Sequence, residues 1–308
     1  MIRFITKRIF LETIPALLVI ATITFFLIRM APGGPFSTEK SISAEALNQL
    51  NSHYGLDKPL FTQYFLYMSR MLTIDFGPSF KYPGRTVTEL IVESFPVSLE
   101  LGLYALLIAL VLGIFSGMIA ASKPSSLRDY LTMTISMTGI CIPSFVLGPL
   151  LVLVFSLKLG LLNVSGWNSP MDRILPAFTL GMVYVAYISR LTRGSLLETM
   201  VQDYIRTARA KGLSEKIIIF RHALRGAILP VLSFLGPAAA GLITGSFVVE
   251  TIFSIPGLGR FFVTAAFNRD YTMIMGTVVF YALIMIFFNT IVDILIAFLN
   301  PRLRSALK

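Results

Sequence analysis

The sequence predicts an all-α protein embedded in a membrane, and three observations support that prediction. Hydrophobic residues make up 55% of the 308 residues and charged residues only 14%, whereas soluble domains carry about a quarter charged residues. Mean hydropathy is +0.78. Long apolar runs recur along the chain, with basic residues gathered between alternate runs. This composition excludes soluble, disordered and collagen-like proteins. Cys141 is the only cysteine, so a protein held together by disulfide bonds within the chain is excluded too.

Six apolar runs are predicted to be transmembrane helices, because crossing ~30 Å of hydrocarbon takes about 20 apolar residues. In chain order they are Ile9–Ile28, Val97–Ala121, Leu131–Leu157, Ile174–Ile188, Ile228–Ile252 and Met275–Leu299. The first run is longer than the core of a secretory signal peptide. No Ala-x-Ala cleavage site follows it at Arg29–Pro35, so we predict a retained helix.

The basic residues predict that both termini are cytoplasmic, because cytoplasmic segments are enriched in Lys and Arg. In that orientation sixteen of the 26 basic residues lie in the inner segments. The net charge of +10 is then an orientation signal, and we expect no nucleic-acid partner. The predicted parts are a first transmembrane helix (1–30), an extracytoplasmic loop or cap (31–95), a five-helix core (96–299) with a cytoplasmic loop (190–228), and a cytoplasmic tail (300–308).

The outer segment between the first two runs is polar and contains two predicted helices. Ser43–Tyr54 has Ser43 as its N-cap, and Leu60–Leu72 carries apolar residues at helical spacing. One interpretation is a cap packed on the outer ends of the spans. The other is a docking surface for an external partner, and the two are compatible.

The inner segment Arg190–Ile228 holds eight basic residues and is longer than a simple connection needs. Asp203 is predicted to cap a helix over Tyr204–Lys211, which Gly212 ends in a left-handed conformation. Ser214 is predicted to cap a second helix. The result is a helical hairpin in the cytoplasm.

Small side chains are predicted to line the leading side of this hairpin and to allow close approach to a groove in a partner. They belong to Thr207, Ala208 and Ala210. The alternative is a basic loop that lies on anionic lipid.

The stretch Arg206-Thr207-Ala208-Arg209-Ala210-Lys211-Gly212, followed by Ile228-Leu229-Pro230, resembles the EAA loop of the membrane subunits of binding-protein-dependent ABC importers. Arg206 replaces the Glu of the common motif, and the interval to Pro230 is longer. Both departures resemble the oligopeptide/dipeptide branch of this family. The segment 249–259, VETIFSIPGLG, is similar to the same branch, and the resemblance runs nearly end to end.

This resemblance implies the fold of a type I ABC importer permease in a bacterial inner membrane. The chain would form half of a pathway for peptides, as the first of two permease subunits. Its implied partners are a homologous second permease, two cytoplasmic ATPase subunits that bind the ATP, and an extracytoplasmic peptide-binding protein. The residues assigned to ATPase coupling are Tyr204, Arg206, Thr207, Ala208, Arg209, Ala210, Lys211 and Gly212.

The sequence offers no enzymatic site. It lacks a Gly-x-x-x-x-Gly-Lys-Ser/Thr phosphate loop and a Gly-x-Ser-x-Gly elbow. Its two histidines, His53 and His222, are predicted on opposite sides of the membrane, so we expect no metal site and no cofactor in this chain.

The alternative function is a self-contained secondary transporter or channel. The lack of a visible internal repeat argues against it.

Four acidic residues fall at or near membrane depth, where a central charge costs at least ~2.5–3.5 kcal/mol. They are Glu12, Glu100, Glu250 and Asp293. We favour structural roles for them. Asp293 is the deepest, and it is a candidate to line the pathway or to pair with a neighbouring helix.

Prolines and glycines predict local features of the spans. Pro143 and Pro149 in the third run, and Pro237 in the fifth, predict bent helices that line the pathway. Gly113-x-x-x-Gly117 and Gly241-x-x-x-Gly245 predict small-residue faces for close helix packing.

Overall fold

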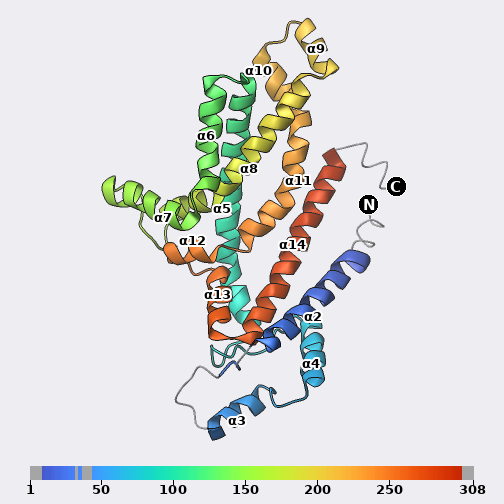
Figure 1. Cartoon of the computed structure of the whole chain (residues 1–308), viewed down its shortest axis with the longest axis vertical. Coiled ribbons are helices and arrows are strands. Elements are labelled where there is room, and N and C mark those ends of the chain that lie inside the picture. Colours follow the sequence, from blue (N-terminus) through green and yellow to red (C-terminus); the bar gives the residue numbers. More distant parts are fainter. Residues whose placement is uncertain (1–8, 32–33, 37–43, 300–308) are drawn as a thin grey trace. The chain divides into compact units, whose positions relative to one another are not determined.

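The computed structural model of the chain describes residues 9–31, 34–36 and 44–299, and in these ranges the regular structure is helical (Figure 1). Strands are absent from the described ranges, where Pro78 and Thr86 form an isolated bridge. The all-α prediction is therefore confirmed. The described residues form two compact units, one from within 1–96 and 257–286 and the other from within 97–256 and 287–299.

The first unit combines the N-terminal span with the outer segment. Its helices are η1 (Ile9–Thr13), α2 (Ile14–Met30), α3 (Ala44–His53), α4 (Leu60–Leu72), the start of α5 (Val87–Ser122), α13 (Leu258–Asn268) and the first part of α14 (Tyr271–Leu299). The two predicted outer helices are present as α3 and α4. The predicted N-cap Ser43 lies outside the described residues.

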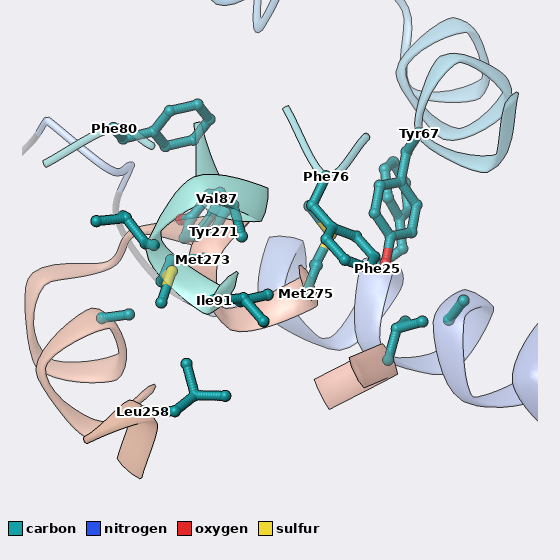
Figure 2. Close-up of a cluster of buried hydrophobic side chains, with 14 of the residues drawn as sticks. Phe25, Tyr67, Phe76, Phe80, Val87, Ile91, Leu258, Tyr271, Met273 and Met275 are labelled. Carbon is teal, nitrogen blue, oxygen red and sulfur yellow. The ribbon is translucent and has the colours of Figure 1, made fainter. Parts of the chain in front are cut away.

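One apolar cluster holds this unit together, and side chains from α2, α4, α5, α13 and α14 meet in it (Figure 2). Phe25 of α2 stacks on Tyr67 of α4, with 5.9 Å between ring centroids. Val87 of α5 and Met273 of α14 are fully buried in the same cluster. The outer segment is thus a packed cap, while its role as a docking surface stays a prediction.

The second unit contains the remaining spans and the inner segment. Its helices are the rest of α5, α6 (Leu127–Cys141), α7 (Ser144–Leu151), η2 (Val152–Lys158), η3 (Pro170–Arg173), α8 (Ile174–Met200), α9 (Asp203–Ala210), α10 (Glu215–Ile217), η4 (Ile218–Ala223), α11 (Leu224–Ile243), α12 (Phe247–Ile252) and the end of α14. Helix α8 packs against both α6 and α11.

In the described part of the chain, five helices are long and apolar enough to cross a membrane, and a bent pair supplies the sixth predicted span when it is counted as one. The pair is Leu127–Cys141 with Ser144–Lys158, and the two parts meet at 109°. The break falls at Ile142 and Pro143, because the residue before a proline avoids the helical conformation. A bend in the third span was predicted from Pro143. Pro237 lies inside α11, and its role in the pathway stays a prediction.

Several spans are longer than predicted. Helix α5 begins at Val87 rather than Val97, and α8 continues to Met200 rather than ending near Ile188. Charged residues ended both predicted spans too early, although the structure gives such residues partners. In α5, Glu93 pairs with Arg85, which lies just before the helix. In α8, Arg193 forms an ion pair with Asp129 at 2.7 Å.

The first glycine motif packs α5 closely against α8, as predicted. A Cβ built on Gly113 would lie 2.7 Å from Ile188, and one on Gly117 would lie 2.6 Å from Thr192. The second motif is different, because α11 ends at Ile243 and Gly245 follows in a turn with φ +85°. The prediction of a continuous helix face at Gly241 and Gly245 is therefore wrong.

Gly117→Ala should destabilise the chain by about 1–3 kcal/mol, because overpacking a tight contact forces neighbours apart. The matched control is Gly194→Ala in α8, where an added Cβ meets nothing within 4 Å. Thermal unfolding in detergent should show a lower midpoint for Gly117→Ala and an unchanged or higher midpoint for Gly194→Ala. Equal midpoints would contradict the close packing of α5 on α8.

The membrane-depth acids of the second unit make contacts that support structural roles. Glu100 accepts a hydrogen bond from Arg173 at 2.7 Å, and the fully buried Glu250 accepts one from Ser98 at 2.8 Å. Asp293 is partly buried on α14, and a pathway role for it stays a prediction.

Candidate coupling hairpin

The inner segment forms a helical hairpin between α8 and α11, and Figure 1 shows α9 and α10 at the same end of these two helices. The first arm is α9, Asp203–Ala210, with Gln202 in the N-cap position. The prediction that Asp203 caps this helix is wrong by one residue. Asp203 instead lies in the first turn, where its charge suits the positive end of the helix. The second arm runs from α10 through η4 into α11 without interruption.

Gly212 ends the first arm in the predicted left-handed conformation, with φ +77°. The Gly212 amide donates to the Arg209 carbonyl at 2.9 Å, and the Leu213 amide donates to the Ala208 carbonyl at 3.4 Å. This pair of bonds is a Schellman motif, which satisfies the last carbonyls of the helix. Ser214 is the N-cap residue of α10 as predicted, although its side chain makes no capping hydrogen bond.

The inner face of α9 is buried against the bundle. Ile205 is fully buried and Ala208 is 5% exposed, in a cluster with Leu196 of α8 and Ile218 and Ala223 of the second arm. The prediction that Ala208 lies on the leading side with Thr207 and Ala210 is therefore wrong, since only the latter two are exposed. Ile205 and Ala208, three residues apart among polar neighbours, are the pattern that locates this face in the sequence.

Tyr204 connects the first arm to the start of α11. Its hydroxyl lies 3.2 Å from the position of a Cβ built on Gly226, and the residue remains 48% exposed. Gly226 therefore leaves room for the tyrosine, a role that the sequence analysis did not assign.

The basic residues of the hairpin have different partners. Arg209 binds Glu215 of the second arm through two hydrogen bonds, of 2.8 and 3.3 Å. Hydrogen bonding to Glu215 raises the pKa of Arg209, so its guanidinium stays charged. Arg206 is 73% exposed and lies 3.6 Å from the exposed Asp203, and Lys211 forms no ion pair with any described residue. Arg209 thus closes the hairpin, while Arg206 and Lys211 point their charges into solvent.

A charge pair that the sequence analysis missed ties α8 to α6. Arg193 donates two hydrogen bonds of 2.7 Å to Asp129, whose side chain is only 4% exposed. Asp129 also accepts from the Ser125 amide, and the Ser126 hydroxyl caps α6. Bidentate pairs of this kind are geometrically specific, so the pair orients α8, which leads into α9.

The remaining candidate residues lie away from the hairpin. Pro143 lies at the break of the third span, and Pro237 lies in α11 beside Gly236, which contacts Asn289 of α14. Asp293 follows Asn289 by four residues and shares its helix face. Among the residues described, no group of three His, Cys, Asp or Glu side chains is placed to hold a metal ion.

Family models match almost the whole chain. The model described as the inner membrane component of binding-protein-dependent transport systems matches residues 109–305, and the model of the N-terminal part of such membrane components matches residues 1–102. The chain belongs to this family. It is a multi-pass permease subunit of an ABC importer, as its sequence predicted.

Relatives in this family are similar over their full length. The oligopeptide transport system permease protein OppB of Haemophilus influenzae is 47% identical over 99% of this chain and 100% of its own. The OppB protein of Salmonella typhimurium is 48% identical with the same coverage. The dipeptide transport system permease protein DppB of Bacillus subtilis is 44% identical over 99% of this chain and 98% of its own. The chain is thus an OppB-like permease.

Solved structures confirm the importer-permease fold. A chain of the MetNI methionine ABC transporter in inward-facing conformations has a TM-score of 0.55 at 16% identity, covering 68% of this chain and 96% of that chain. A chain of an amino acid ABC transporter with histidines has a TM-score of 0.51 at 17% identity, covering 68% and 93%. At these identities the likeness concerns the fold alone.

Proposed function

We propose that this permease forms half of the pathway of an ATP-driven peptide importer and that the α9–α10 hairpin couples it to a separate ATPase subunit. The observation that carries the coupling role is the division of the hairpin into two faces. Ile205 and Ala208 anchor it to α8 and η4, while Arg206, Ala210 and Lys211 are left exposed. A partner that binds the exposed face of the hairpin would move the spans, because the buried face packs on them.

The mechanism follows from the connections of the hairpin. Its first arm follows α8 directly and its second arm continues into α11, so a displacement of the hairpin acts on two spans that pack together. When ATP closes the ATPase dimer, the hairpin moves with it, the spans tilt, and the cavity opens outward. Hydrolysis returns it to the inward-facing state. ATP drives this cycle only because it binds the two states with unequal affinity.

Peptides are the proposed substrates, because the relatives at 44–48% identity carry the names of oligopeptide and dipeptide permeases. The proposed partners are a homologous second permease, two cytoplasmic ATPase subunits and an extracytoplasmic peptide-binding protein. The chain itself is proposed to be non-enzymatic, with ATP held by the partners. The distribution of basic residues supports a cytoplasmic location for both termini and for the hairpin.

The test is purification of the tagged chain from its native membrane in mild detergent, with identification of the proteins that accompany it. ATP hydrolysis is then measured with and without the extracytoplasmic fraction and peptide. We expect a second permease and ATPase subunits, with hydrolysis stimulated by that fraction plus peptide. A chain that purifies alone and moves solute after reconstitution would instead be a secondary transporter.

A charge reversal tests the exposed face directly. Arg206→Glu should reduce the amount of ATPase that co-purifies, because it inverts a charge that faces the partner. Arg128→Glu is the matched control, since Arg128 is an exposed arginine outside the hairpin. Equal ATPase recovery from both variants would count against the hairpin as the contact.

A further inference from the structure

A cavity of about 170 Å³ lies inside the first unit, and its wall is strongly basic. Arg29 comes from the end of α2, His53 from the end of α3, Lys58 from the turn between α3 and α4, and Arg70 from α4. Among the described residues that line it, none is an aspartate or glutamate, so the charges they contribute have one sign.

Arg29 is the central charge of this wall. Its guanidinium donates hydrogen bonds of 2.9 and 3.2 Å to the Gln63 side chain and lies 3.6 Å from the centre of the Phe25 ring. It is partly buried, and within the described part of the chain it forms no ion pair with a carboxylate. A buried charge without a counter-charge is unfavourable, so the site favours an anion.

Tyr67 supplies a second, independent indication. The residue is 8% exposed, it lines the cavity, and its hydroxyl has no hydrogen-bond partner among the described residues. Figure 2 shows its ring beside that of Phe25. The Arg29 guanidinium lies over the same Phe25 ring. Burial raises the pKa of Tyr67, so the hydroxyl keeps its proton and can donate a hydrogen bond to an anion. Buried polar groups are normally paired, and an anion in this cavity would pair this one.

We propose that the cavity formed by Arg29, Tyr67, Lys58 and Arg70 is a binding site for a phosphate oxyanion. A phosphate offers several acceptor oxygens, which matches guanidinium, ammonium and hydroxyl donors that converge from different elements. Arg29 lies in the last turn of one span and Met275, also in the lining, lies near the start of another. Span ends are at the depth of lipid headgroups, so the source is the phosphodiester of an anionic lipid or a free phosphate.

The experiment uses the full chain, purified with the subunits that accompany it and stripped of lipid. Phosphatidylglycerol, phosphatidylcholine and inorganic phosphate are added separately, and bound lipid and the thermal midpoint are measured. We expect phosphatidylglycerol to bind at least about tenfold more tightly than phosphatidylcholine, and Arg29→Gln to weaken that binding by about tenfold or more. Tyr67→Phe, which removes only the hydroxyl, should weaken it by about threefold to tenfold.

The control is Arg85→Gln, because Arg85 is paired with Glu93 and does not line the cavity. It should bind like the unchanged chain. Stabilisation by inorganic phosphate that depends on Arg29 would identify a soluble anion, and stabilisation by phosphatidylglycerol alone would identify the lipid. Equal binding of both lipids with no effect of phosphate would overturn the proposal. Unchanged binding of phosphatidylglycerol by Tyr67→Phe would also overturn the proposal. If Arg29→Gln does not fold, Tyr67→Phe is the variant that decides the test.

Discussion

Gly212→Val should reduce peptide uptake and peptide-stimulated ATP hydrolysis by about tenfold or more, while the chain still inserts in the membrane. Gly212 has φ +77°, and a β-branched residue in this region is a genuine outlier. The left-handed conformation costs about 1–2 kcal/mol for a residue with a Cβ, and about 1.4 kcal/mol corresponds to a factor of ten in an equilibrium constant. The hairpin would open at the Schellman motif and lose the alignment of its two arms.

Gly212→Asn is the matched control, because asparagine tolerates the left-handed conformation better than other residues with a Cβ. Nothing lies within 4 Å of a Cβ built on Gly212, so neither variant introduces a clash. Peptide uptake should therefore depend on how well each residue adopts the left-handed conformation. Gly212→Asn should take up peptide nearly as well as the unchanged chain. Full uptake by Gly212→Val at normal expression would remove the hairpin from the coupling mechanism.

Tryptophan substitutions at two neighbouring alanines should abolish ATPase association by different routes. Ala210 is exposed, so Ala210→Trp should leave the thermal midpoint of the chain unchanged while its bulk blocks the groove of the partner. Ala208 is buried between α9 and the bundle. Ala208→Trp should lower the midpoint, since overpacking costs about 1–3 kcal/mol or more, and should displace the hairpin as a consequence.

The two variants are measured together by thermal unfolding and by ATPase co-purification. Thr207→Ala serves as the control on the exposed side, because it shortens a side chain whose hydroxyl bonds within α9 itself, to the Asp203 carbonyl at 3.1 Å. Retained ATPase with Ala210→Trp would show that the exposed face of α9 is not the contact. An unchanged midpoint with Ala208→Trp would contradict the buried position of that residue.

The sequence located the hairpin well, and its limits have identifiable causes. Gly212 was recognised as a helix terminator because its chemistry is local, and the structure places it in the expected conformation. The helix bounds were off by one residue, and α8 was cut short at its charged end. A hydropathy pattern treats Arg193 as the end of a span, whereas the buried Asp129 allows the helix to continue.

The sequence by itself determined the helical membrane-spanning fold, the break at Pro143 and the family. Each of these depends on composition, on a single backbone preference or on a motif. Only the tertiary structure decided which faces of those helices are covered. Ala208 and Ala210 have the same side chain, two residues apart, yet one is buried and the other exposed. The basic wall around Arg29 was equally hidden, since its members come from three helices and a turn. Burial depends on neighbours that are distant in the chain, and no local pattern contains them.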